Sequence, residues 1–236
     1  MREKFGAGVV LLIASLVLCW QGDRYHVTQD DAFTAFVYSK NLATGQGLTF
    51  NPSERVEGYT NFLWVLIMTL PHLLSSDIPR IANLLAVLCI VAAVVLLYFC
   101  GQNFRPQRPM VFALVAPILL ATNGAMAFWT FSGMETALFT LLLTAGGYRY
   151  IRDLDGTAES HWTGALFGLA ALTRPEGLLA FGITSLHHLI ATGPRNTATL
   201  SKWFRWTIPF FILVVPHFAF RYYYYDQLLP NTFYAK

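Results

Sequence analysis

The chain has few charged side chains. Asp, Glu, Lys and Arg make up 12% of its 236 residues, against about 25% in soluble globular domains. Hydrophobic residues make up 55% of the chain. They fall in blocks whose lengths are close to that of a transmembrane helix, which needs about 20 residues. This composition excludes an ordinary soluble domain. It predicts an all-α, polytopic membrane bundle, because backbone exposed to lipid must form its hydrogen bonds within each helix.

Cysteine is also scarce, and repeats and low-complexity linkers are missing. Cys19, Cys89 and Cys100 do not form a Cys-x-x-Cys motif, so the sequence predicts neither a zinc site nor a disulfide framework. Without a visible linker, residues 1–236 are expected to form one domain. The formal net charge of +3 fits the Lys and Arg excess of cytoplasmic loops and does not indicate a nucleic-acid partner.

The apolar blocks give the expected spans. Arg2 and Lys4 precede the first block, which favours an uncleaved first span with a cytoplasmic N-terminus over a cleaved signal peptide. The segment at 62–75 is short and contains Pro71, as in a partial or re-entrant helix. Candidate segments lie at 5–20, 62–75, 79–100, 110–127, 134–149, 162–173, 177–190 and 206–221. The number of crossings between residues 60 and 130 stays open.

The longest polar interval, 29–64, begins with Asp30 and Asp31. These acids open a predicted amphipathic helix at 30–44 that ends at Gly45 and lies on the membrane surface. Adjacent carboxylates can act as a general base and its partner, because the charge of one raises the proton affinity of the other. The alternative is that both acids simply interact with the helix dipole.

The second half of this interval carries Arg55 between two acids, Glu54 and Glu57, and Tyr59 follows them. A guanidinium suits a phosphate because its planar fork donates two parallel hydrogen bonds. The alternative is a solvated loop that contains a local ion pair.

Further polar motifs interrupt the later apolar blocks. Ser132 with Glu135, and Thr173 with Glu176, fit capping boxes at helix starts. Capping does not explain Arg174, which lies between two apolar blocks. A charge at such a position usually faces a bundle interior or a wet cavity. Basic loops around residues 105–108, 149–152 and 195–205 place these motifs on the outer face, with the acid pair.

The C-terminal stretch begins at Arg221 and continues with four tyrosines, which are typical of an interfacial aromatic belt. Lys236 is the last residue, and neither a polar tail nor a closing loop follows the tyrosines. We therefore expect this to be an interrupted sequence.

Taken together, these motifs resemble the GT-C membrane glycosyltransferases, in particular the branch that includes the mycobacterial terminal arabinofuranosyltransferase. The resemblance follows the chain in order, and its most specific motif is Val-Glu-Gly-Tyr-Thr-Asn-Phe-Leu-Trp at 56–64. The other motifs are Asp-Asp-Ala-Phe at 30–33, Asn41 with Gly-Gln-Gly-Leu at 45–48, Phe-Asn-Pro at 50–52, Ser-Gly-Met-Glu-Thr at 132–136, Arg-Pro-Glu-Gly at 174–177 and Leu-Pro-Asn-Thr-Phe-Tyr-Ala-Lys at 229–236.

The resemblance implies an enzyme that transfers a sugar from a polyprenyl-phosphate carrier to an acceptor hydroxyl, outside the cytoplasmic membrane, in cell-envelope glycan synthesis. Family members carry an essential acid in the first external loop, where Asp30 and Asp31 match. Members of this branch are usually longer, so the resemblance implies that these 236 residues are an N-terminal fragment without the C-terminal part. We expect Asp31 to be the base of an inverting reaction and Asp30 its orienting partner. The expected donor phosphate and sugar site comprises Arg55, Glu57, Tyr59, Glu135, Arg174 and Lys236.

No metal or other cofactor is predicted, although carboxylates at Asp30, Asp31, Glu57 and Glu135 are suitable ligands for Mg²⁺ or Ca²⁺. The expected donor is a lipid monophosphate, which carries less charge than a diphosphate and therefore needs a metal ion less.

The alternative functions are a carrier or flippase for lipid-linked sugars, or a scaffold subunit. Transporters usually have repeated halves and a broken-helix site at the membrane midplane. This sequence has no repeat, and its polar residues lie mainly at span ends.

Overall fold

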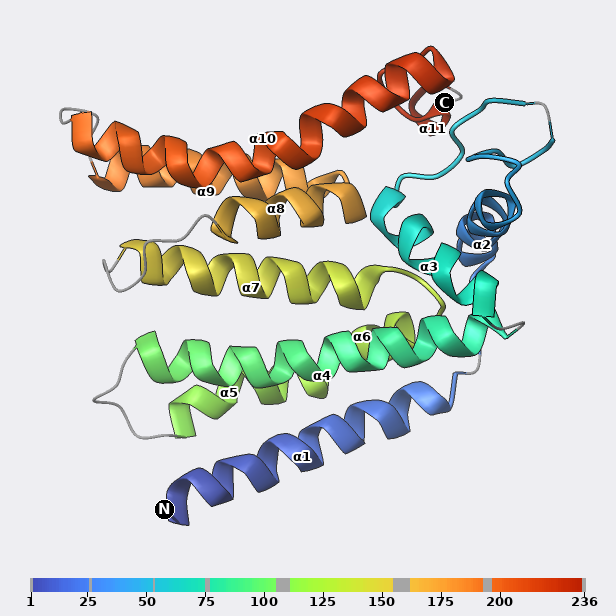
Figure 1. Ribbon diagram of the computed structural model, residues 1–236. Helices are drawn as coiled ribbons and strands as arrows, with labels where there is room; N and C mark the ends of the chain where they lie inside the picture. Colours follow the sequence, from blue (N-terminus) through green and yellow to red (C-terminus); the bar gives the residue numbers. More distant parts are fainter. Residues whose placement is uncertain are drawn as a thin grey trace. The chain divides into compact units, whose positions relative to one another are not determined.

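The computed structural model describes residues 2–25, 27–52, 54–74, 77–104, 111–154, 162–192 and 197–234. Every regular element in these ranges is a helix, which confirms the all-α prediction (Figure 1). Each predicted apolar segment falls on a helix or on a pair of helices. The helices are α1 (Arg2–Asp23), α2 (Asp30–Ala43), α3 (Phe62–Leu74), α4 (Ile78–Phe104), α5 (Val111–Ala121), α6 (Gly124–Thr130), α7 (Thr136–Leu154), α8 (Trp162–Thr173), α9 (Glu176–Thr192), α10 (Thr197–Tyr225) and α11 (Asn231–Tyr234).

Three stretches of helix in the described ranges are long and apolar enough to cross a membrane: Phe5–Asp23, Ile78–Asn103 and Trp203–Tyr225. Helices α5 and α6 provide a fourth if the bent pair counts as one span. Helices α3 and α8 are apolar but shorter, as the sequence indicated for the segment at 62–75. These findings support a helical membrane bundle.

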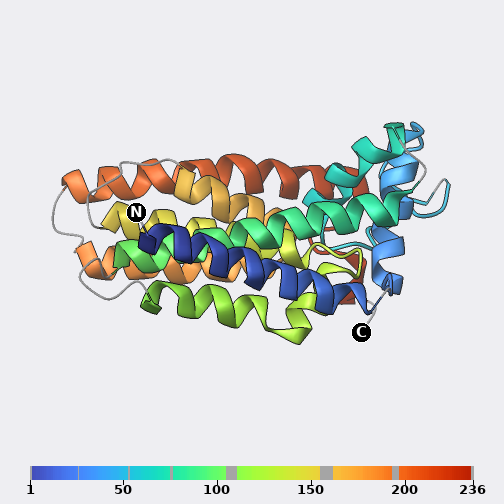
Figure 2. The same cartoon turned by 90° about the horizontal axis from the view of Figure 1, so that it is seen from below.

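The segment at 110–127 differs from its prediction as one helix. Helix α5 ends at Ala121, and α6 starts at Gly124 after a bend of 59°, which Figure 2 shows from below. The physical reason is Asn123, whose side chain accepts a hydrogen bond from the Met126 N–H at 3.0 Å. This cap satisfies a backbone donor at a helix start, so the chain begins a new helix there.

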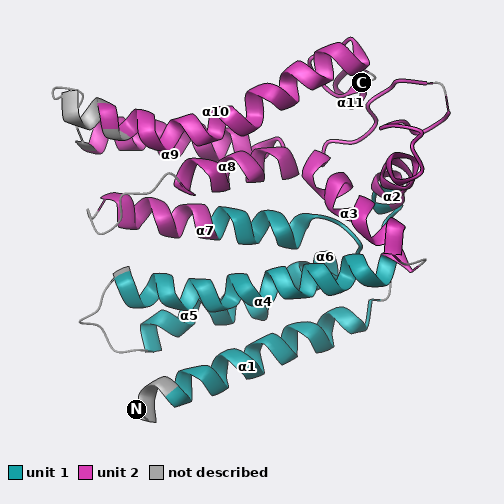
Figure 3. Cartoon of the chain, in the orientation of Figure 1, with its two compact units in different colours: residues 1–32, 79–144 teal, residues 33–78, 145–236 magenta. Residues whose placement is uncertain are grey.

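The described chain divides into two compact units (Figure 3). Unit 1 comprises residues 1–32 and 79–144, and unit 2 comprises residues 33–78 and 145–236. In unit 1, α1 packs against α5 and α6. Its core is built largely from small side chains, which lets helices approach closely. Core residues include Leu18, Ala86, Ala93, Ala121 and Ala127.

Unit 2 is centred on α8, which packs against α9, α10 and α3. Gly164 of α8 lies against the backbone carbonyl of Trp206 in α10, where an added Cβ would overlap that oxygen. The rings of Phe181 and Phe210 stack with their centroids 3.5 Å apart. Close backbone approach and aromatic stacking therefore hold α8, α9 and α10 together.

Helix α2 begins and ends close to its predicted bounds, and its chain turns at Gly45 with φ of 79°. The sequence predicts one apolar face of this helix from Ala32, Phe33, Ala35, Phe36 and Leu42, and the structure buries this face only in part. Ala32, Ala35 and Phe36 are buried as expected, whereas Phe33 is 49% exposed. Tyr38 takes a buried place instead, because its hydroxyl bonds to the loop that follows α2.

Candidate active site

The acid pair lies in the first turn of α2, and both Asp30 and Asp31 are exposed. The residue before them is anchored, because the Gln29 N–H donates to the Ser132 carbonyl at 3.0 Å. Two motifs about 100 residues apart in the sequence therefore meet in unit 1. The arrangement presents two carboxylates to solvent from a fixed backbone, which suits proton transfer from an approaching hydroxyl to a carboxylate.

The loop at 132–135, which supplies the Ser132 carbonyl to this hydrogen bond, has buried side chains at both ends. Ser132 and Glu135 are 0% and 3% exposed. Gly133 has φ of 80°, a conformation that favours glycine, and its N–H donates to Asn83 Oδ1 at 3.1 Å. The predicted capping box is wrong in detail. The Ser132 hydroxyl donates to the Trp129 carbonyl at 2.8 Å, and its oxygen faces the Met134 N–H at 3.4 Å.

Unit 2 contains a buried ion pair. Arg221 Nε donates to Glu57 Oε2 at 2.7 Å, and the two side chains are 8% and 3% exposed. Burial raises the pKa of the Glu57 carboxyl, because it penalises the charged form, and the neighbouring Arg221 opposes that rise. The pair joins the loop at 48–61 to the end of α10.

Two tyrosines form a hydrogen-bonded chain beside this pair. Tyr225 donates to the Leu48 carbonyl at 2.7 Å, and its oxygen lies 3.2 Å from the Tyr59 hydroxyl. Since the single proton of Tyr225 goes to Leu48, Tyr59 donates to Tyr225. Burial raises the pKa of Tyr59 far above the usual range, so this hydroxyl stays protonated and able to donate.

The loop at 48–61 is fixed from both sides. Tyr38 of α2 donates to the Val56 carbonyl at 2.6 Å and accepts from the Gly58 N–H at 2.9 Å. From the C-terminal side, the Asn231 N–H donates to the Glu57 carbonyl at 3.0 Å. Arg55 stays exposed and places its guanidinium 5.0 Å from the centre of the Tyr224 ring.

Arg174 lies between α8 and α9 and bonds to Glu176 at 3.4 Å, with its side chain 34% exposed. The predicted capping box between Thr173 and Glu176 is wrong. The Thr173 hydroxyl donates to the Leu169 carbonyl at 2.8 Å, because Thr173 is the last residue of α8.

The predicted site residues thus separate between the units. Unit 1 holds Asp30, Asp31 and Glu135 close to one anchor, and unit 2 holds Arg55, Glu57, Tyr59 and Arg174. Lys236 lies outside the described residues. In the ranges that the structure describes, no group of three or more His, Cys, Asp or Glu is placed to hold a metal ion.

Sequence reasoning did not assign a site role to Arg221 or Tyr225. The sequence does contain a signal for Arg221, because this residue is a charge at the end of an apolar block. The same argument indicated Arg174 as a candidate site residue. Tyr225 carried no comparable signal. It belongs to a run of four tyrosines of which Tyr222 and Tyr223 are exposed, and only Tyr225 is buried at 7%.

The comparisons with known proteins support a related glycosyltransferase. No protein-family model matches the chain, and no solved structure does so. The chain is 28% identical over 221 residues to a terminal beta-(1->2)-arabinofuranosyltransferase of Mycobacterium tuberculosis, covering 88% of this chain and 34% of that protein. It is 27% identical over 254 residues to the protein of the same name from Corynebacterium glutamicum, covering 95% of this chain and 35% of that protein. The chain therefore shows weak homology to terminal arabinofuranosyltransferases over most of its own length and about a third of theirs.

Proposed function

We propose that this chain belongs to a membrane glycosyltransferase that moves a sugar from a polyprenyl-phosphate carrier to an acceptor hydroxyl in cell-envelope glycan synthesis. The observation that carries this proposal is the similarity to two arabinofuranosyltransferases over 88% and 95% of the chain. The reaction takes place at the outer face of the cytoplasmic membrane.

In the proposed reaction, Asp31 accepts the proton of the acceptor hydroxyl, and Asp30 orients it. The acceptor oxygen attacks the anomeric carbon as the bond to the phosphate oxygen breaks, so the lipid phosphate leaves and the configuration inverts. The exposure of both carboxylates on α2 supports this role, because a general base must reach the proton that it removes.

The donor is proposed to bind through the cations of the site. Arg55 and Arg174 supply positive charge toward the departing phosphate, as does Lys236. Glu57 and Glu135, each 3% exposed, act by holding the loops that carry the site, as does the equally buried Tyr59. No metal takes part in the proposed reaction.

The test is transfer of radiolabelled sugar from a panel of polyprenyl-phosphate sugars by the protein in lipid nanodiscs. We expect Asp31→Asn to lower the rate by about 10² or more, and Asp30→Asn to lower it less. Asp226→Asn is the matched control, because Asp226 is exposed and its φ of 59° is tolerated by asparagine. Transfer should persist in a chelator.

The same assay separates the competing functions. Normal transfer by both aspartate variants would remove the catalytic role of the acid pair. Movement of the lipid-linked sugar across the bilayer without transfer would favour a carrier, and the absence of both activities would favour a scaffold subunit.

A further inference from the structure

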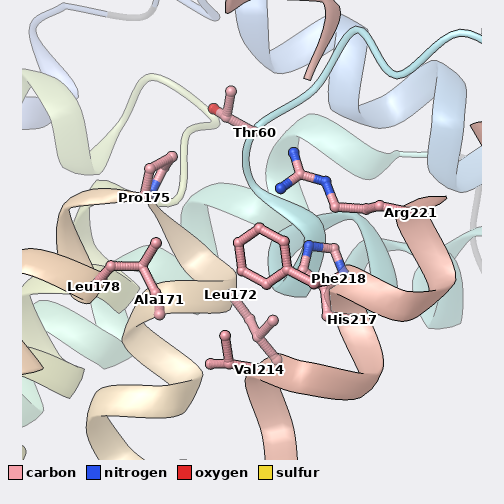
Figure 4. A pocket seen from close by; sticks show the side chains of 9 residues that line it. All are labelled: Thr60, Ala171, Leu172, Pro175, Leu178, Val214, His217, Phe218 and Arg221. Carbon is pink, nitrogen blue, oxygen red and sulfur yellow. The ribbon is translucent and has the colours of Figure 1, made fainter. Parts of the chain in front are cut away.

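Unit 2 contains a small cavity that none of the predicted site residues lines. Its volume is about 30 Å³, which is room for one water-sized group. In Figure 4, the guanidinium of Arg221 reaches from α10 toward the side of the cavity where Thr60 and Pro175 lie. The lining residues are Thr60, Ala171, Leu172, Pro175, Leu178, Val214, His217, Phe218 and Arg221.

Arg221 brings to this cavity a positive charge and hydrogen-bond donors that Glu57 does not use. The residue is 7% exposed, and its Nε is used by Glu57. Among the described residues, no hydrogen bond joins its terminal nitrogens, Nη1 and Nη2, to a protein acceptor. These two nitrogens form the fork edge that binds an oxyanion through two parallel hydrogen bonds. Glu57 therefore orients Arg221 and leaves the fork free.

A second lining residue also has an unused polar atom. His217 Nδ1 is buried and has no hydrogen-bond partner in the described part of the chain. Buried polar atoms are usually satisfied by protein or by ordered water. Thr60, which also carries a polar side chain, is among the residues that line the same cavity. None of the described lining residues is acidic, and the apolar walls strengthen attraction between opposite charges.

We propose that this cavity is an oxyanion site in which Arg221 binds the phosphate of the lipid carrier, one phosphate oxygen entering the cavity. This inference rests on the proposed function for the source of the phosphate, and its chemistry is that of a phosphate group. The location suits a lipid headgroup, because Arg221 lies near the end of a candidate span and is followed by the exposed Tyr222 and Tyr223, which are typical of the membrane interface.

The experiment measures equilibrium binding of radiolabelled undecaprenyl phosphate to the protein in nanodiscs. Undecaprenol, which lacks the phosphate, is the lipid control, and inorganic phosphate is the competitor. Arg221→Lys keeps the charge that Glu57 needs but removes the fork, so we expect binding at least about tenfold weaker. Arg205→Gln, an exposed cation on the same helix, controls for general loss of positive charge and should bind as the unmodified protein does.

Two further variants separate the site from the fold. Glu57→Gln removes the carboxylate that orients Arg221 but keeps an oxygen acceptor for Nε, so binding should weaken less than in Arg221→Lys. Glu57→Gln/Arg221→Met removes both charges together and should abolish the preference for undecaprenyl phosphate over undecaprenol. If this double variant does not elute as folded protein, the binding measured with Arg221→Lys decides whether the proposal holds.

Unchanged binding by Arg221→Lys would overturn the proposal. Binding of inorganic phosphate alone would support the oxyanion site and overturn the lipid source. Asp31→Asn distinguishes this inference from the proposed function, because it should lose sugar transfer and still bind undecaprenyl phosphate. Phosphate binding that needs Arg221 in a protein without any transfer would overturn the proposed function only.

Discussion

Arg221 and Glu57 are 164 positions apart in the sequence, yet Nε of the first lies 2.7 Å from Oε2 of the second with both side chains nearly inaccessible. Such a pair is costly to form, because both charges lose their hydration. Its contribution is geometric, since it fixes the loop at 48–61 against α10 and orients a guanidinium whose terminal nitrogens have no described protein acceptor.

Breaking this pair from one side should destabilise the protein strongly. Arg221→Met leaves the Glu57 charge buried without its partner, which costs about 3–5 kcal/mol. The double variant Glu57→Gln/Arg221→Met should lose much less, because no uncompensated charge remains. The measurement is the free energy of unfolding in mixed micelles by denaturant titration. Glu176→Gln, which removes an exposed ion pair with Arg174, is the control and should cost less than about 0.5 kcal/mol. Equal losses in the single and double variants would contradict this account.

Stability should depend on pH through Glu57. Burial raises the pKa of this carboxyl in the folded protein, so the folded state holds the proton more tightly than the unfolded chain. The contribution of Glu57 to stability is therefore fully present below its unfolded pKa and is lost as pH rises through the higher folded pKa. The test compares the unfolding free energy of the protein with that of Glu57→Gln from about pH 4 to about pH 8. A difference that grows with pH would mean that Arg221 outweighs burial.

The hydrogen-bonded pair of Tyr59 and Tyr225 gives a prediction whose control lies among the same four consecutive tyrosines. Tyr225→Phe removes the hydroxyl that donates to the Leu48 carbonyl and accepts from Tyr59, so two buried polar groups lose a partner. The expected loss is about 1–3 kcal/mol of unfolding free energy. Tyr223→Phe changes a side chain that is 84% exposed and should cost less than about 0.5 kcal/mol. Similar effects of both substitutions would show that Tyr225 serves only as an interfacial aromatic.

The helices were predictable because the length of an apolar block is a local property of the sequence. The block at 162–173 matches α8 residue for residue, and Pro71 together with its short block indicated the short α3. The break between α5 and α6 was missed. Asn123 there is a good cap, but an apolar block does not reveal which of its polar residues will start a new helix.

The sequence indicated both exposed and buried members of the candidate site, but not the contacts of the buried ones. Asp30, Asp31 and Arg55 are singled out by their residue types and lie exposed as a reactive or binding group requires. The partners of Glu57 and Tyr59 could not be inferred, since their contacts to Arg221 and Tyr225 span 164 and 166 positions. Such pairing is fixed by tertiary packing of α10 against the loop, and no local pattern in one sequence encodes it.

Gly133 tests whether the loop at 132–135 supports the acid pair. Alanine at this position must adopt the φ of 80° that costs a residue with a Cβ about 1–2 kcal/mol, or shift the loop. A shift would move Ser132, whose carbonyl holds Gln29 beside Asp30. We therefore expect Gly133→Ala to lower the rate of sugar transfer per folded molecule by about tenfold, beyond its loss of stability. Gly147→Ala is the matched control, because a Cβ on this α7 residue would meet nothing within 4 Å. If Gly133→Ala lowered stability and left transfer per folded molecule unchanged, the loop would be a structural element without influence on the acids.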